Sequence, residues 1–190
     1  MTTDSKYTNQ VADFALPVVS GGTGRLSEHL AGKRGALVVF WSGVCSHCVR
    51  YDGYLNEFET RYPELAALAV AAREHESRAQ LQAIRSQRKL VFPLLHDADR
   101  ALAHRWFVRQ TPTAFLIAAD REVIYRGAID NFKYPRDPAY EPHLDRAIAA
   151  FLNGTRPERA ETPTFGCPLE SVHYNLPKPL GLPPRLRLGE

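Results

Sequence analysis

A continuously apolar stretch over residues 35–41 most constrains how this chain can fold. It reads Gly-Ala-Leu-Val-Val-Phe-Trp, with β-branched residues at its centre. Such a run is typical of a strand that is covered on both faces of a sheet, because a half-exposed strand would alternate apolar and polar residues. The stretch ends at Ser42, and a helical pattern with Cys45 and Cys48 in its first turn follows as far as Tyr62. The sequence therefore predicts a buried strand that leads directly into a helix.

The rest of the chain alternates between strand and helix patterns. Strands are predicted over residues 11–16, 65–71, 92–96, 113–118 and 122–127, and helices over residues 26–30, 76–89, 99–107 and 143–152. Strand–helix alternation produces parallel strands with helices on both faces of a sheet. The short turn between the last two strands instead makes an antiparallel hairpin. We therefore expect an α/β fold in which a mixed central sheet lies between two layers of helices.

The two ends of the chain differ from this folded part. We expect residues 1–10 to be a polar lead-in, residues 11–152 to form the domain, and residues 153–190 to be a Pro-rich C-terminal extension. Proline at frequent intervals argues against a helix or a central strand in this tail. The apolar side chains expected to anchor it as a strap on the domain are Phe165, Leu169, Tyr174, Leu176 and Leu180.

Charge and hydropathy exclude several function classes. The 190 residues carry a net charge of +3, which is too mild to indicate nucleic-acid binding. Apolar runs are too short to span a bilayer, so no membrane partner is expected. The N-terminus has no basic segment followed by an apolar stretch. This predicts a cytoplasmic protein, or a periplasmic one if a leader has been removed; the oligomeric state is left open.

The chemistry of the chain is concentrated in its cysteines. Three cysteines are too few for a secreted disulfide scaffold and indicate reactive thiols or metal ligands. Cys45 and Cys48 lie at a predicted helix start, which brings their side chains within reach of a disulfide and stabilises a thiolate. We expect Cys45, at the outer edge, to be the nucleophile and the more buried Cys48 to resolve the mixed disulfide. His47, between them, would make the disulfide more oxidising by stabilising the Cys45 thiolate.

Two short segments stand out when they are taken together. They are Phe40-Trp41-x-x-x-Cys45-x-x-Cys48 and, before the predicted hairpin, Gln110-Thr111-Pro112-Thr113. In this order they resemble the thioredoxin-like superfamily, in particular its redoxin branch of thiol–disulfide oxidoreductases. The resemblance implies a thioredoxin-like three-layer α/β/α sandwich, a cis Pro112 that faces the cysteine pair, and substrate contacts from Trp41, Thr111 and Pro112. It also implies a protein or small-molecule thiol or disulfide as the partner, and no cofactor or metal.

The chain departs from the resemblance at two positions. Val39 stands where thioredoxin has a buried acid, and Tyr51 stands where some reducing relatives have a glutamate. Asp52 is adjacent but is expected to face another direction on a helix. Both changes remove the usual proton acceptor for the resolving thiol, which argues against a fast general reductase.

Several features leave alternatives open. Cys167, in the tail, is either a third redox thiol or a spare one, and redoxin-like proteins can carry an extra cysteine near the C-terminus.

A peroxiredoxin-like hydroperoxide reductase using Cys45 is the first alternative function; Ser42 then stands where such sites usually have threonine. A non-enzymatic metal carrier is the second, although the spacing matches no usual zinc or haem motif. The long segment at residues 130–138 is expected to shape a substrate surface or to bind the tail.

Overall fold

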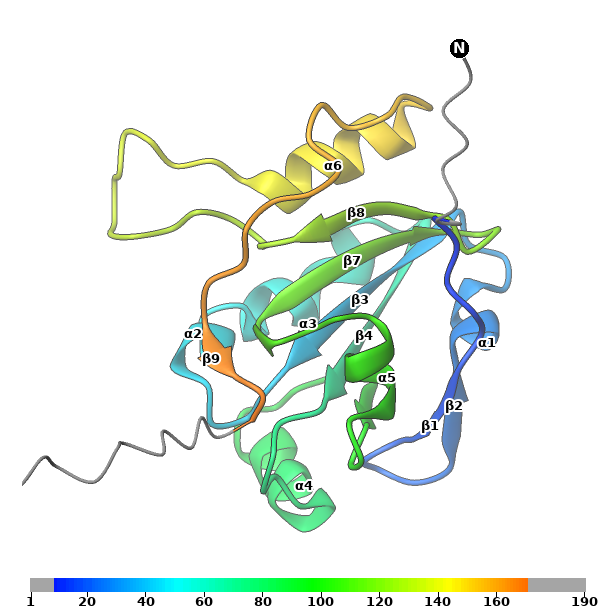
Figure 1. Cartoon of the computed structure of the whole chain (residues 1–190), viewed down its shortest axis with the longest axis vertical. Coiled ribbons are helices and arrows are strands. Elements are labelled where there is room, and N and C mark those ends of the chain that lie inside the picture. Colours follow the sequence, from blue (N-terminus) through cyan, green and yellow to red (C-terminus); the bar gives the residue numbers. More distant parts are fainter. Residues whose placement is uncertain (1–8, 171–190) are drawn as a thin grey trace, which may run out of the picture.

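The computed structural model describes residues 9–170, which are built around a five-stranded sheet (Figure 1). The order of the strands across the sheet is β5-β4-β3-β7-β8. Strands β3 (Gly35–Trp41), β4 (Leu65–Ala71) and β5 (Leu94–His96) are parallel, whereas β7 (Thr113–Ala118) and β8 (Val123–Gly127) are antiparallel additions. The predicted mixed sheet is therefore confirmed.

Strand β3 lies in the middle of the sheet and is buried along its whole length. Its alternate residues enter two separate apolar clusters because successive side chains of a strand point to opposite faces. Leu37, Val39 and Trp41 belong to one cluster, and Ala36 and Val38 belong to the other. This two-sided burial explains why the strand has no polar residue.

Between residues 9 and 170, six helices surround the sheet. They are α1 (Leu26–Leu30), α2 (Ser46–Val49), α3 (Asp52–Arg61), α4 (Arg78–Gln87), α5 (Ala101–Arg105) and α6 (His143–Leu152). Helices α1 and α5 contribute Leu26 and Leu102 to the cluster on one face, while α3 and α6 contribute Phe58 and Ile148 to the other. The helices thus form the two outer layers that the strand–helix alternation predicts.

Two small sheets flank the central one. Strand β1 (Ala15–Pro17) pairs with β2 (Thr23–Arg25), and β6 (Gln110–Thr111) pairs with β9 (Cys167–Pro168). The first strand predicted at residues 11–16 is therefore wrong in its bounds, since only its last two residues belong to β1. Gly21 and Gly22 lie in the turn between β1 and β2.

The helix predicted from Cys45 to Tyr62 is interrupted. Helix α2 ends at Val49, and α3 begins at Asp52. Val49, the last residue of α2, is 47% exposed. Helix α5 is also shorter than predicted, and the Asp97 carboxylate accepts the N–H groups of Leu102 and Ala103 in its first turn at 3.2 and 2.8 Å.

The described part of the tail runs back across the domain as a strap, defined here as residues 155–170 (Figure 1). Thr162 is buried against strand β8, where the Tyr125 hydroxyl lies 2.5 Å from its Oγ1. Leu169 is buried as expected, whereas Phe165 is 78% exposed and is not an anchor. The other expected anchors, Tyr174, Leu176 and Leu180, lie outside the described residues, as does most of the lead-in.

Helices of the described region are short. Over residues 9–170, none has the length and apolar character needed to cross a bilayer.

Candidate active site

The loop between β3 and α2 places the first two cysteines at the end of a buried strand. Cys45 precedes the first residue of α2, and its carbonyl accepts the N–H groups of Cys48 and Val49 at 2.9 and 3.2 Å. This tight turn leaves Cys45 and Cys48 3.7 Å apart as free thiols. A disulfide bond requires only a small approach of the two sulfurs.

Cys45 and Cys48 have opposite acidities. A hydrogen bond from the Cys48 side chain, with a further one from Cys167, lowers the pKa of Cys45 to about 4 against the opposing effect of burial. Burial, together with the neighbouring Cys45, raises the pKa of Cys48 above its ordinary value. These opposite shifts favour the thiolate form of Cys45 and the protonated form of Cys48 near neutral pH.

The sequence predicted that Cys45 lies at the outer edge of the site, and this prediction is wrong. Both Cys45 and Cys48 are 0% exposed. The Cys45 Sγ atom lies 3.2 Å from the Thr111 carbonyl oxygen, and the tail brings Cys167 beside it. The sequence could not predict this burial because the covering residues are more than sixty positions further along the chain.

Thr111 and Pro112 reach the cysteine pair through the segment before β7. The peptide bond between them is cis, and Thr111 is fully buried. The Thr113 hydroxyl donates to the Gln110 carbonyl at 2.7 Å and stabilises the turn. The structure thus brings these two residues to Cys45, although they are distant in sequence.

Trp41 was expected to contact substrate, but it is fully buried in the core. Its Nε1–H donates to Asp52 Oδ1 at 3.1 Å, and the Arg88 guanidinium lies 5.0 Å above its ring. Arg88 also donates to Asp52 at 2.7 Å and to the Gly43 carbonyl at 2.8 Å. Trp41 therefore packs under the cysteine loop through its contact with Arg88, and the Asp52 carboxylate accepts hydrogen bonds from both Trp41 and Arg88.

Glu76 is a site residue that the sequence analysis did not select. Its Oε1 atom accepts the N–H groups of Gly43 and Val44 at 2.7 and 3.3 Å, so it fixes the loop that precedes Cys45. Burial raises the pKa of Glu76 above its ordinary value. The only sequence signal was an acidic residue just before a helix cap, which is common and uninformative.

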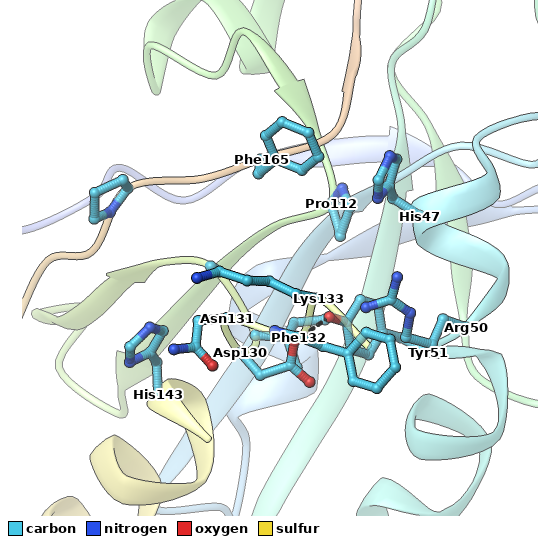
Figure 2. A pocket seen from close by; sticks show the side chains of 13 residues that line it. His47, Arg50, Tyr51, Pro112, Asp130, Asn131, Phe132, Lys133, His143 and Phe165 are labelled. Atoms are coloured by element: carbon cyan, nitrogen blue, oxygen red, sulfur yellow. Dashed lines mark hydrogen bonds between the residues drawn. The ribbon is translucent and has the colours of Figure 1, made fainter. Parts of the chain in front are cut away.

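A cavity of about 440 Å³ is lined by His47, the residue that precedes Cys48 in the chain (Figure 2). His47, Pro112 and Phe165 line one part of it, and the His47 ring packs edge-on against Phe165 with centroids 5.1 Å apart. The lining residues contributed by the segment that follows β8 are Ala128, Ile129, Asp130, Asn131, Phe132 and Lys133. That segment and Phe165 of the tail both line this cavity, and whether it is a substrate surface stays a prediction.

Arg50 and Tyr51 connect the cavity to the cysteine helix. The Arg50 guanidinium lies 4.1 Å from the centre of the Phe132 ring, and the Tyr51 hydroxyl donates to Asp130 at 2.5 Å. The hydrogen bonds that lower the pKa of Cys45 come from other residues, so the tuning role of His47 stays a prediction. Within residues 9–170, no group of three or more His, Cys, Asp or Glu side chains is arranged to hold a metal ion.

The depressed pKa of Cys45 gives a direct test by titration. We expect the ultraviolet absorbance of the thiolate in the reduced protein to persist at neutral pH and to disappear only as the pH falls through about 4. A free cysteine would lose it near about 8.5. The transition should be absent from Cys45→Ser, and circular dichroism recorded in parallel would separate it from acid unfolding. A transition near the free value would contradict the assigned hydrogen bonds.

Comparison with known proteins adds family and fold. The model of the AhpC/TSA family matches residues 7–126. Thiol-disulfide oxidoreductase ResA of Geobacillus kaustophilus is 28% identical over 111 residues, which cover 58% of this chain and 63% of that relative. The chain therefore matches less than two thirds of the length of this curated relative.

Solved structures agree with the observed architecture. A hypothetical protein of Sinorhizobium meliloti superposes with a TM-score of 0.76 at 24% identity, covering 90% of this chain and 98% of that one. A thiol-disulfide oxidoreductase of Bacteroides fragilis gives a TM-score of 0.54 at 18% identity, covering 62% and 88%. At these identities the likeness shows the fold alone, which is thioredoxin-like.

Proposed function

Because this chain belongs to the AhpC/TSA family, we propose that its Cys45–Cys48 pair exchanges disulfides with a protein or small-thiol partner. The observation that carries the proposal is the pair itself: two free sulfurs 3.7 Å apart with opposite pKa shifts. A low pKa produces the attacking thiolate, and a high pKa keeps the second thiol protonated until the first has reacted.

The exchange proceeds in two steps. The Cys45 thiolate attacks one sulfur of a partner disulfide, a bond forms between them, and the partner's other sulfur leaves with the electron pair and takes up a proton. Cys48 then gives up its proton and attacks Cys45 Sγ, which forms the Cys45–Cys48 disulfide and releases the partner's remaining sulfur as a thiol. The reverse sequence oxidises a dithiol partner.

Surrounding residues support the two steps. Glu76 accepts the N–H group of Gly43, and Arg88 donates to the Gly43 carbonyl. These two bonds fix the loop, so Cys45 keeps its position relative to Cys48. The cavity beside His47 and Pro112 offers the adjacent surface on which a partner would rest. His47 is proposed to tune the potential from the cavity wall.

The stabilised Cys45 thiolate predicts whether the reduction potential of the Cys45–Cys48 couple is high or low. A thiolate that is favoured in the reduced protein makes the disulfide more oxidising. We expect a reduction potential less negative than about −270 mV, the value of thioredoxin. Equilibration of the protein with defined ratios of reduced and oxidised glutathione, followed by alkylation and mass determination, measures it.

The same preparation distinguishes the alternative. Reduction of insulin disulfides or glutathione disulfide is expected to be faster than consumption of hydrogen peroxide. Rapid peroxide consumption through Cys45, without measurable disulfide exchange, would favour the peroxiredoxin-like reading instead. The Cys48→Ser variant is the matched control, because it keeps Cys45 but cannot form the Cys45–Cys48 disulfide.

A further inference from the structure

Strand β9 brings a third thiol to the candidate active site. It pairs antiparallel with β6, with Thr111 opposite Cys167 and Gln110 opposite Pro168. On the far side of the pair, the Leu169 N–H donates to the Arg109 carbonyl at 3.0 Å, and its own carbonyl accepts the Glu74 N–H at 2.8 Å. The buried Leu169 side chain fixes this end of the strap.

Cys167 meets Cys45 at this pairing. Thr111, its partner across the ladder, is the residue whose carbonyl oxygen lies 3.2 Å from Cys45 Sγ. Cys167 packs against the apolar cluster that contains Cys45 and Cys48, and its side chain is among the groups that lower the pKa of Cys45. Cys45, on the other side, is 0% exposed. Cys45 is thus closed to solvent in this structure, and Cys167 is the third thiol already placed at its side.

We propose that Cys167 is a second resolving thiol for Cys45, held by the strap so that Cys45 forms its disulfide alternately with Cys48 and with Cys167. This inference rests on the proposed function, in which Cys45 is the nucleophile. In this arrangement the strap occupies the position of a bound partner chain, and the Cys45–Cys167 form is an internal mixed disulfide.

The exchange needs no external oxidant. Starting from the Cys45–Cys48 disulfide, the Cys167 thiolate attacks Cys45 Sγ. The bond between Cys45 and Cys167 forms, the bond between Cys45 and Cys48 breaks, and its electron pair stays on Cys48 Sγ. Cys48 takes up the proton that Cys167 has lost, so the number of disulfides and thiols is unchanged.

Gly166 makes this close approach possible. A methyl group at Gly166 would overlap the Thr111 carbonyl and would lie 3.2 Å from the Pro112 nitrogen. Gly166→Ala is therefore expected to push the strap away from Cys45. Gly53 offers a matched control, because an added methyl group there meets nothing within 4 Å and the residue lies within α3.

The test traps the proposed disulfide in Cys48→Ser. Oxidation with glutathione disulfide at low protein concentration is followed by tryptic mapping without reduction. Trypsin releases Cys45 in a peptide of residues 35–50, separate from the peptide that carries Cys167. We expect these two peptides to be joined, within a chain of monomer mass. In Cys48→Ser/Cys167→Ser, Cys45 should instead carry glutathione.

The glycine variants test the strap as the means of delivery. Gly166→Ala in the Cys48→Ser background should reduce the Cys45–Cys167 peptide about tenfold or more, whereas Gly53→Ala should leave it unchanged. Circular dichroism checks that both variants fold. An undiminished cross-link in folded Gly166→Ala would overturn the inference.

Failure of this inference is separable from failure of the proposed function. If wild type forms Cys45–Cys48 but Cys48→Ser forms no Cys45–Cys167 bond, or forms one only between two copies, Cys167 is not a resolving thiol and the proposed function stands. If wild type forms no Cys45–Cys48 disulfide in glutathione buffers, the proposed function itself is wrong.

Discussion

Replacing Cys45 with serine is expected to abolish disulfide exchange, with a rate loss of about 10³-fold or more. The reason is that Cys45 is the sulfur whose pKa is depressed to about 4, while burial keeps Cys48 protonated. Serine keeps the size of the side chain but cannot form a disulfide. The measurement is the rate of glutathione-disulfide or insulin reduction under saturating electron donor.

The companion variants give this prediction its specificity. Cys48→Ser/Cys167→Ser should retain the first attack and accumulate mixed disulfides with the partner, because both proposed resolving sulfurs are missing. Cys167→Ser should retain both the attack and the resolution by Cys48. Substantial exchange by Cys45→Ser, or loss of the first attack in Cys48→Ser/Cys167→Ser, would mean that the roles of Cys45 and Cys48 are reversed.

Replacing Arg88 with methionine is expected to lower the free energy of unfolding by about 3 kcal/mol. The Arg88 and Asp52 side chains are only 19% and 14% exposed, and they form an ion pair beneath the cysteine loop. Methionine keeps much of the packing against Trp41 but leaves the Asp52 carboxylate without its cation and the Gly43 carbonyl without its donor. Urea denaturation of the reduced proteins measures the difference.

An exposed ion pair provides the comparison. Arg25 lies 3.8 Å from Asp13, with 54% of its side chain exposed, so Arg25→Met should cost less than about 1 kcal/mol. Equal effects of the two substitutions would show that burial beneath the loop does not strengthen the Arg88 pair. An unfolding free energy for Arg88→Met within about 0.5 kcal/mol of wild type would rule out the support role.

The sequence predicts best those elements whose pattern is local. Strand β3 follows from an unbroken apolar run, and the β7–β8 hairpin follows from two short runs with a turn between them. Cys45 and Cys48 were found because their spacing and position after a strand carry chemical meaning. The interruption between α2 and α3 was missed because helical periodicity continues across it.

The supporting groups of the site were not predictable because their partners are remote in sequence. Glu76 binds a loop thirty-three residues before it, and Arg88 binds one forty-five residues before it. Each looks like an ordinary charged residue until the fold brings the loop to it. Trp41 was expected to contact substrate because of its position in the motif. The fold instead places its side chain in the apolar cluster on one face of β3.

The burial of Thr162 against β8 has a consequence for how far the end of the strap can travel. Gly127, at φ +148°, lets the Thr162 backbone lie directly against it, and the Ala128 N–H donates to Thr162 Oγ1 at 3.1 Å. If this point stays fixed while β9 peels away, residues 163–167 can extend to at most about 17 Å. A sulfur tethered within that radius has a local concentration on the order of tens of millimolar. Recapture of Cys45 would then outpace any free thiol present at low millimolar levels, whatever the amount of protein in solution.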